Sequence, residues 1–545
     1  MSCFRSHACV LVSFLLLGSF QANGEALKET EKGGISERQP RLGGIYHIPL
    51  LNEPPTLDPA FVEDSYGLTV VQQIFDGLVR FSPDLLIVPA LAQNWRMEDH
   101  GRLYRFFLRP NARFHNNRPV TSQDVIFSLS RLIRANPPPS ILPHLLKISG
   151  AQDFREKKSD RVVGLSAEDD HSLLVRLDEP YTPFLTALGM YQAKIVPKEE
   201  VGLREATFGK NPIGSGPFQL ASWEANKRIR LRKFDDYYDG APYLDELQFL
   251  IYPGSNMEEV LSDFQSGKLE EMPAYWQFRE KLLGHSGVRW VHRPSLGLLF
   301  YGFNCQHPTL RSPEVRRALA MSIDRQKIIS EVYKGQFERA GELLPPGMPG
   351  YLPQSKMWYD DMDQAKALLK KAFETKEDAL PTIEVVSNSQ SPLAQAELDM
   401  VRESWSQLGI RMAPKFIPDW SQFEQYLKSD SLQVYRYAWV ADMPDPESFL
   451  QPLVASTSQV NYMRFRNEEV DAILKDASQI VDLVERAKLC HRIEEVAAES
   501  CPLIPLFFLS VDRVYQAFVR GIEVTALGEE AVSFHHVWLE ASSEQ

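Results

Sequence analysis

Cysteine is scarce in this chain, and the few residues present form no metal-binding pattern. The sequence has five cysteines in 545 residues, and their spacing matches no zinc motif. Cys490 lies in a helical pattern that runs to about Ser500, and the separation from Cys501 corresponds to about 16 Å of helix. A disulfide needs Cα atoms within about 7 Å, so we expect these two not to pair. Together with Cys305, they should be buried, inert thiols.

Long hydrophobic runs are also missing, apart from one near the N-terminus. The run from 8 to 20 is about a dozen residues, shorter than the roughly 20 that a membrane helix needs. Arg5 precedes it and small residues follow at 21–24, which predicts a secretory signal peptide over 1–24. Neither Cys3 nor Cys9 follows the cleavage site, so we expect a free periplasmic protein without a lipid anchor. The polar residues 25–42 should form a flexible N-terminal tail.

Positive charge is in deficit. The chain has 59 Lys and Arg against 72 Asp and Glu, and removal of the signal peptide, which holds only Arg5, changes the balance from -13 to -14. A net negative charge of this size argues against nucleic acid or an anionic membrane as a partner.

Catalytic motifs are absent from the sequence. Ser215 lies between two glycines, but Ile213 stands where a nucleophile elbow needs a further glycine. No GxxxxGK[ST], GxGxxG or HExxH occurs, so the sequence predicts no nucleotide site, no metal site and no cofactor. We therefore expect a protein that is not an enzyme, with an exported hydrolase as a remote alternative.

Alternating strands and helices fill the chain and predict an α/β protein. About 520 mature residues exceed what one core usually supports, so two or three lobes are expected. Helices are predicted at 68–78, 258–265, 364–373, 393–408, 467–481 and 483–500, with two more capped by Thr121 and Ser312. Strands are predicted at 44–50, 103–110, 172–177, 218–223, 228–234, 247–252, 300–305, 382–387, 410–416 and 502–509. The segment 382–416 is a βαβ pattern.

An aromatic, β-prone run at 434–440 precedes Asp442. Pro444 and Pro446 cannot continue a strand, so Asp442 should lie where a core strand becomes a loop. Binding groups collect at such positions, which makes Asp442 a candidate anchor for a cationic ligand. By itself, the local sequence favours the simpler alternative, a cap for the following turn.

Four motifs lie at 104–125, 214–218, 304–325 and 439–449. Their residues and their order resemble the extracytoplasmic solute-binding proteins of ABC importers, specifically the dipeptide and oligopeptide family. The resemblance covers nearly all of 43 to about 538. The Asp-Gly that the family usually has at one turn is replaced here by Asn116 and Asn117, which serve the same turn.

This resemblance implies a periplasmic-binding-protein-like fold with two α/β lobes and an extra subdomain in the first lobe, the cluster C type. The hinge would lie where the chain crosses between lobes, near 303–305 and 506–508. The first lobe would comprise 43–81, 210–304 and 506–545, the inserted subdomain 82–209, and the second lobe 305–505.

The resemblance also implies site residues. In peptide-binding members, an aspartate three residues after a tryptophan pairs with the α-ammonium group of the ligand, and Trp439 and Asp442 have that spacing. Trp439 would form an apolar wall near the cation. Arg436 matches an arginine that holds the peptide carboxylate in some members. A straight strand would separate Arg436 from Asp442 by about 20 Å, so the chain bends, Arg436 serves longer peptides, or it pairs with an acidic neighbour.

The expected function is that of a monomeric periplasmic receptor for short peptides, which delivers them to ABC permease subunits in the inner membrane. Relatives on the same scaffold carry nickel chelates, haem, glutathione or oligosaccharides, so a non-peptide cargo is an alternative. A sensory or chaperone-like binding protein without a permease is another.

Overall fold

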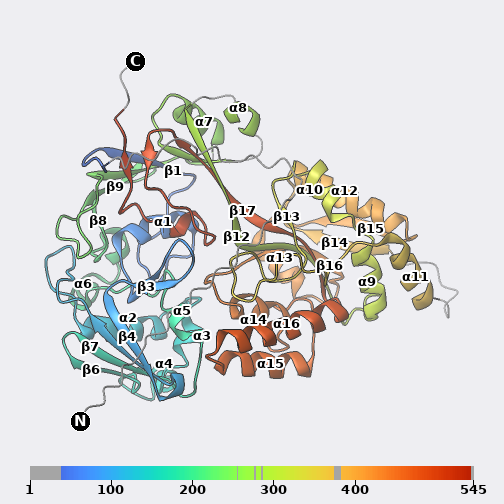
Figure 1. Ribbon diagram of the computed structural model, residues 1–545, viewed down its shortest axis with the longest axis horizontal. Coiled ribbons are helices and arrows are strands. Elements are labelled where there is room, and N and C mark those ends of the chain that lie inside the picture. The colour runs from blue at the N-terminus through green and yellow to red at the C-terminus, as the bar shows by residue number, and fades with distance from the viewer. Residues whose placement is uncertain (1–38, 255, 275–277, 284–286, 374–381, 542–545) are drawn as a thin grey trace, which may run out of the picture. The chain divides into compact units, whose positions relative to one another are not determined.

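Strands and helices alternate along the chain, as the sequence pattern predicts (Figure 1). The described strands form one seven-stranded, two four-stranded and two two-stranded sheets. The structure is a computed structural model that describes residues 39–541 except 255, 275–277, 284–286 and 374–381. The predicted signal peptide 1–24 and all but the last four residues of the predicted tail 25–42 lie outside the described residues. Among the residues described, no helix is long and apolar enough to cross a membrane.

The first four-stranded sheet combines the N-terminal strand with the segment 218–251. Strand β1 pairs with β10 in parallel, and the other neighbours are antiparallel. Helix α1 (Ser65–Ile74) begins three residues before the predicted 68, because the Asp64 carboxylate accepts a hydrogen bond from the Gly67 N–H at 2.8 Å and caps it there. The strands, in sheet order, are β1 (Ile45–Leu50), β10 (Glu246–Ile251), β9 (Arg228–Lys233) and β8 (Phe218–Glu224).

The second four-stranded sheet is antiparallel and belongs wholly to the predicted inserted segment 82–209. One of its two inner strands, β5, buries Tyr104, Phe106 and Leu108 on one face. Helix α2 (Ser122–Arg134) contributes to the same core. The strands, in sheet order, are β4 (Ala92–Glu98), β5 (Leu103–Leu108), β7 (Ser172–Arg176) and β6 (Leu165–Asp169).

The seven-stranded sheet carries the largest core. Strands β14 and β15 are parallel and are joined by helix α12 (Pro392–Ser406), so the predicted βαβ unit is confirmed. The strands, in sheet order, are β11 (Glu271–Pro273), β17 (Leu503–Gln516), β12 (Val288–Phe303), β16 (Val434–Val440), β14 (Thr382–Ser387) and β15 (Arg411–Phe416), with β13 (Glu338–Arg339) paired to β17.

The long strands β12 and β17 pass from one core to another, and Figure 1 shows them running side by side. Their register shifts between Pro294 and Leu298. Before the shift they pack with a small core that includes Val514, and from Leu296 onward with the largest core. Both strands are longer than the sequence predicted, because the added part carries charged residues that interrupt the apolar run.

Helices surround the largest core, and α9 begins at Pro313 with Ser312 as its N-cap, as predicted. The helices here are α9 (Pro313–Met321), α10 (Arg325–Glu331), α11 (Met362–Phe373), α13 (Trp420–Leu427), α14 (Glu447–Val454), α15 (Glu468–Gln479) and α16 (Leu483–Ser500). The other described elements are β2 (Val79–Phe81), β3 (Ile87–Pro89), η1 (Asp99–Gly101), α3 (Leu142–Leu145), α4 (Ala151–Arg155), α5 (Phe184–Ala187), α6 (Lys198–Arg204), η2 (Phe208–Lys210), α7 (Met257–Gln265), α8 (Arg279–Leu283), β18 (Val519–Arg520), η4 (Glu529–Ala531) and β19 (Trp538–Leu539).

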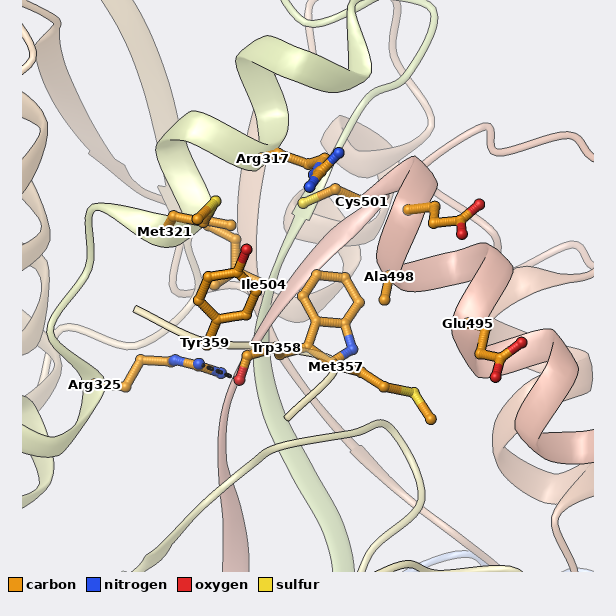
Figure 2. Close-up of a pocket in the computed structure, with 12 residues that line it drawn as sticks. Arg317, Met321, Arg325, Met357, Trp358, Tyr359, Glu495, Ala498, Cys501 and Ile504 are labelled. Carbon is orange, nitrogen blue, oxygen red and sulfur yellow. Dashed lines mark hydrogen bonds between the residues drawn. The ribbon is translucent and has the colours of Figure 1, made fainter. Parts of the chain in front are cut away.

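The three cysteines in the described part of the chain are buried and free, as the sequence predicted. Burial raises the pKa of Cys305 to about 11 and those of Cys490 and Cys501 to about 12, so all three remain thiols at neutral pH. Cys501 lines a cavity of about 230 Å³ beside Trp358 and Ile504 (Figure 2). None of the three predicted site residues lines this cavity.

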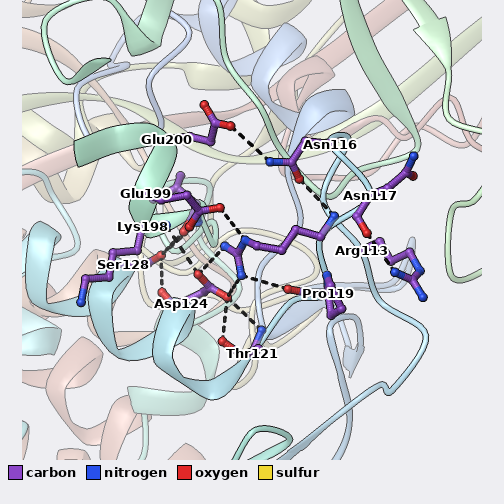
Figure 3. Close-up of polar contacts among 12 residues, drawn as sticks. Arg113, Asn116, Asn117, Pro119, Thr121, Asp124, Ser128, Lys198, Glu199 and Glu200 are labelled. Atoms are coloured by element: carbon purple, nitrogen blue, oxygen red, sulfur yellow. Dashed lines mark hydrogen bonds and ion pairs between the residues drawn. The ribbon is translucent and has the colours of Figure 1, made fainter. Parts of the chain in front are cut away.

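The turn at Asn116 and Asn117 forms as predicted. Asn117 has a left-handed backbone with φ of 66°, which asparagine tolerates better than most residues. The backbone N–H of Thr121 donates to Asp124 at 2.9 Å in a capping box at the start of α2. Arg118 binds the same Asp124 carboxylate with two hydrogen bonds, at 2.9 and 2.7 Å, and so ties the turn to the helix (Figure 3).

Candidate functional site

Strand β16 lies between β12 and β14 and ends just before Asp442. Successive side chains of a strand point to opposite faces, so Arg436 and Trp439 lie on opposite faces of the sheet. The segment from Asp442 to Ser448, here called the anchor loop, follows the strand and includes the first two residues of α14. Asp442 therefore lies in the anchor loop and Trp439 just before it. The side chain of Arg436 lies on the face of the sheet opposite to Trp439.

Asp442 is exposed to solvent. Its surroundings nevertheless raise its pKa above the ordinary value, because nearby protein removes part of the water that would hydrate the charge, and a hydrogen bond with Ser140 opposes this effect. Among the described residues, none forms an ion pair with it. Asp442 is thus a partly desolvated carboxylate without a cationic partner.

Polar side chains of the inserted segment lie around Asp442. Gln192 donates from Nε2 to the Ser140 hydroxyl at 2.6 Å. Gln192 is only 2% exposed, and its Oε1 has no hydrogen-bond partner among the described residues. Burial and the nearby Asp442 charge raise the pKa of Tyr191 to about 12. The surroundings of Asp442 are therefore polar and of negative or neutral charge, which suits a cationic group.

Trp439 is half-buried against the largest core. Its indole Nε1 donates to the Ser448 carbonyl at 2.7 Å. This bond fixes the ring beside the anchor loop, so Trp439 can offer a rigid apolar surface near Asp442.

Arg436 forms an ion pair with an acidic side chain of the protein itself. It forms a bidentate ion pair with Glu397 of α12, at 2.9 Å from Nε and 3.0 Å from Nη2. The hydroxyls of Tyr301 and Tyr333 donate to the same fully buried carboxylate. Burial lowers the pKa of Arg436, and Glu397 more than offsets this, so the guanidinium stays charged. Of the three alternatives left by the sequence, the structure shows pairing with an acidic neighbour. A peptide-carboxylate role for Arg436 stays a prediction that requires this pair to be shared.

Hydrogen bonds on the buried side of the anchor loop fix its conformation. Asp445 forms two hydrogen bonds to Arg486 of α16, at 2.7 and 2.6 Å, and both side chains are buried. The same Asp445 accepts the Glu447 N–H at 2.9 Å, and the Ser448 hydroxyl donates to the Met443 carbonyl at 2.9 Å. These bonds fix the path of the loop and with it the direction in which Asp442 points.

Reasoning from the sequence missed the residues that surround Asp442 from the inserted segment, namely Ser140, Tyr191 and Gln192. They lie 250 to 302 residues before Asp442 and carry no motif, so only the packing of the folded chain brings them to the site. Ser215, the one candidate nucleophile, is fully buried. In the described part of the chain, no group of three or more His, Cys, Asp or Glu side chains could hold a metal ion.

Comparisons with known proteins agree on one family. The family described as "Bacterial extracellular solute-binding proteins, family 5 Middle" matches residues 87–461. The dipeptide-binding protein of Escherichia coli K12 is 27% identical over 481 residues, covering 84% of this chain and 87% of that protein. Heme-binding protein A of Haemophilus influenzae is 27% identical over 455 residues, covering 80% and 81%. The structure of the Escherichia coli murein tripeptide binding protein MppA is similar with a TM-score of 0.73, 26% identity and coverage of 92% and 98%.

Proposed function

This chain belongs to the family 5 bacterial extracellular solute-binding proteins and has their two-lobed α/β fold, and from this premise we propose that it is the periplasmic receptor of an ABC importer for short peptides. It binds a peptide between its lobes and delivers it to the permease subunits in the inner membrane. It makes and breaks no covalent bond. The predicted lobe boundaries and the predicted monomeric state are part of the same proposal.

The open carboxylate of Asp442 is the observation that supports a peptide cargo. A primary ammonium has three N–H donors, and a partly desolvated carboxylate binds such a group by short, charge-assisted hydrogen bonds. Ser140, which accepts a hydrogen bond from Gln192, adds a neutral polar group beside it, and Trp439 adds an apolar wall. The N-terminus of a peptide supplies a group of this kind, whatever its side chains are.

Calorimetry with trialanine and N-acetyl-trialanine tests this proposal. Trialanine should bind, and the acetylated peptide should bind poorly because it has no ammonium group for Asp442. Equal affinity for both peptides, or no binding of either, would remove the peptide proposal. Native mass spectrometry of the protein as purified gives an independent reading, because a retained ligand reveals its mass.

A haem cargo is the second candidate, since a relative of similar identity is named a haem-binding protein. Titration with haemin, followed by absorption spectroscopy, separates the two. Saturable binding of haemin, together with no detectable binding of trialanine, would favour the second candidate. A haem ligand has no ammonium group, so Asp442→Asn should leave its affinity unchanged.

A further inference from the structure

The anchor loop meets the inserted segment at three points, although the two are far apart in the sequence. Asp442 lies beside Ser140, whose side chain lowers the pKa of this carboxyl. Met443 lies in the core of the inserted segment. Glu447 accepts a hydrogen bond from Tyr181. The loop that carries the candidate ligand anchor is thus attached to both halves of the chain.

Met443 makes the apolar part of this attachment. It is 1% exposed, and the other described members of its core lie between residues 60 and 195 or between 234 and 238. Burying a methionine side chain contributes about 1.5 to 3 kcal/mol. Burial of Met443 therefore stabilises the contact between the anchor loop and the inserted segment.

Tyr181 makes the polar part. Its hydroxyl donates to Glu447 Oε1 at 2.5 Å, and it lies 2.6 Å from His144 Nδ1. While Glu447 is ionised it only accepts, so the Tyr181 proton then points to Glu447 and His144 donates to the Tyr181 oxygen. Burial lowers the pKa of His144 to about 4, so this histidine is neutral at pH 7, and in that arrangement its proton is on Nδ1.

Thr182 extends the attachment to the end of α15. Its N–H donates to the Ser478 carbonyl, and its hydroxyl donates to the Ile480 carbonyl, both at 2.8 Å. Gln479 donates to Glu179 at 3.1 Å. Glu179, Tyr181 and Thr182 thus each form a hydrogen bond with the anchor loop or with residues at the end of α15.

We propose that Tyr181 and Met443 are positioning residues that latch the anchor loop onto the inserted segment and hold Asp442 in its ligand-binding orientation. This inference rests on the function proposed above, because it assigns the latch a role in that same site. With the latch formed, a bound peptide leaves slowly. With the latch broken, the loop moves with the second lobe alone and the peptide leaves faster.

Glu447 makes the latch sensitive to pH. Burial and the adjacent Asp445 raise the pKa of Glu447 to about 7, while the Tyr181 hydrogen bond and the charges of Arg486 and Lys147 oppose this rise. A released, hydrated Glu447 would titrate near the usual value of about 4.3. The latched state therefore binds the proton more tightly. Through Glu447 alone, the latch is strongest below about pH 4.3 and weakens as the pH rises to about 7. His144, whose pKa burial lowers to about 4, acts in the opposite direction, because protonation of this buried ring at acid pH weakens the latch.

Hydrogen exchange tests the latch without any ligand. In Tyr181→Phe the ring still packs, but Glu447 loses its donor, so the amides of 179–184 and 443–450 should exchange about tenfold faster. Tyr359→Phe is the matched control, because it removes the hydroxyl that donates to Gln364 on a distant surface. It should leave both segments unchanged. Unchanged protection of both segments in Tyr181→Phe would overturn the latch.

Stopped-flow displacement of bound trialanine gives the functional reading. Tyr181→Phe should raise the dissociation rate about tenfold. Glu447→Gln keeps an acceptor for Tyr181 and removes the titration of this carboxyl, so it should keep slow release and show a smaller pH dependence between pH 5.5 and 7, below the range in which the peptide's own α-amino group titrates. A pH dependence in Glu447→Gln as large as in the unaltered protein would contradict the role of this carboxyl. If trialanine does not bind the unaltered protein, the peptide proposal fails, while hydrogen exchange still decides whether the latch exists.

Discussion

At the residue scale, the carboxylate of Asp442 should decide the affinity for a cationic ligand. Asp442→Asn keeps the shape of the side chain and removes its charge, so a bound ammonium would remain desolvated without an anionic partner. We expect trialanine binding to weaken by about 2 to 5 kcal/mol, measured by calorimetry at pH 7. Asp430→Asn is the matched control, because the Asp430 side chain is 98% exposed and, among the described residues, pairs only with Arg464. Equal losses in both variants would show that the effect is not specific to the site.

The raised pKa of Asp442 predicts how acid affects binding. A protonated carboxyl cannot pair with an ammonium, so affinity falls as the pH falls through this pKa, which lies above the ordinary value of about 3.9. The measurement uses Glu447→Gln, so that the carboxyl of the latch does not titrate in the same range. Calorimetry should show trialanine affinity declining before pH 4 is reached. An affinity that is constant from pH 7 to pH 4 would contradict a role for Asp442.

The residues of the site differ in how far the sequence could predict them. Trp439 and Asp442 lie within a single strand and the loop after it, so their spacing in the sequence was enough to propose them as a site. The partner of Arg436 lies on α12, and sequence spacing does not show which helix packs on which face of a strand. Gln192 and Tyr181 come from another part of the chain and have no local signature, so only tertiary packing reveals them.

At the element scale, the pair Arg436–Glu397 joins β16 to α12. Glu397 is fully buried and accepts four hydrogen bonds, two from Arg436 and two from tyrosine hydroxyls. Glu397→Gln leaves the guanidinium buried without a charged partner, so the free energy of unfolding should fall by about 3 to 5 kcal/mol, measured in urea. The double substitution Glu397→Leu with Arg436→Met should recover most of this loss, because neither charge then remains buried.

Arg436→Met separates the structural role of this arginine from a ligand role. If Arg436 only holds α12, this variant loses stability and keeps trialanine affinity, apart from any loss through unfolding. A large loss of affinity at unchanged stability would instead assign the guanidinium to the peptide carboxylate.

Strands β12 and β17 show where the sequence misleads at this scale. The apolar segments 300–305 and 502–509 were predicted, whereas the strands extend to Val288 and to Gln516. The extensions pair charged residues across the two strands, such as His292 Nδ1 with Asp512 at 2.8 Å. A periodicity search weighs apolar residues, so a strand whose exposed face carries ion pairs does not stand out.

At the scale of the whole molecule, the order of strands and helices and the family motifs predicted the fold class well. The contacts that complete the site could not be predicted in this way. The anchor loop lies in the predicted second lobe, yet Met443 belongs to the core of the inserted segment. Contacts of this kind join segments about 260 residues apart, and no pattern in one sequence specifies them.

A double-mutant cycle tests whether the two halves of the molecule act as one site. In the background that keeps Asp442, Tyr181→Phe should weaken trialanine binding, because the latch holds Asp442 toward the ligand. In the Asp442→Asn background there is no carboxylate to position, so Tyr181→Phe should have little further effect on the dissociation constant. Residues that act through one another show such non-additivity, whereas independent sites add within about 0.5 kcal/mol. Additive losses in calorimetry would mean that Tyr181 affects the protein by a route that does not pass through Asp442.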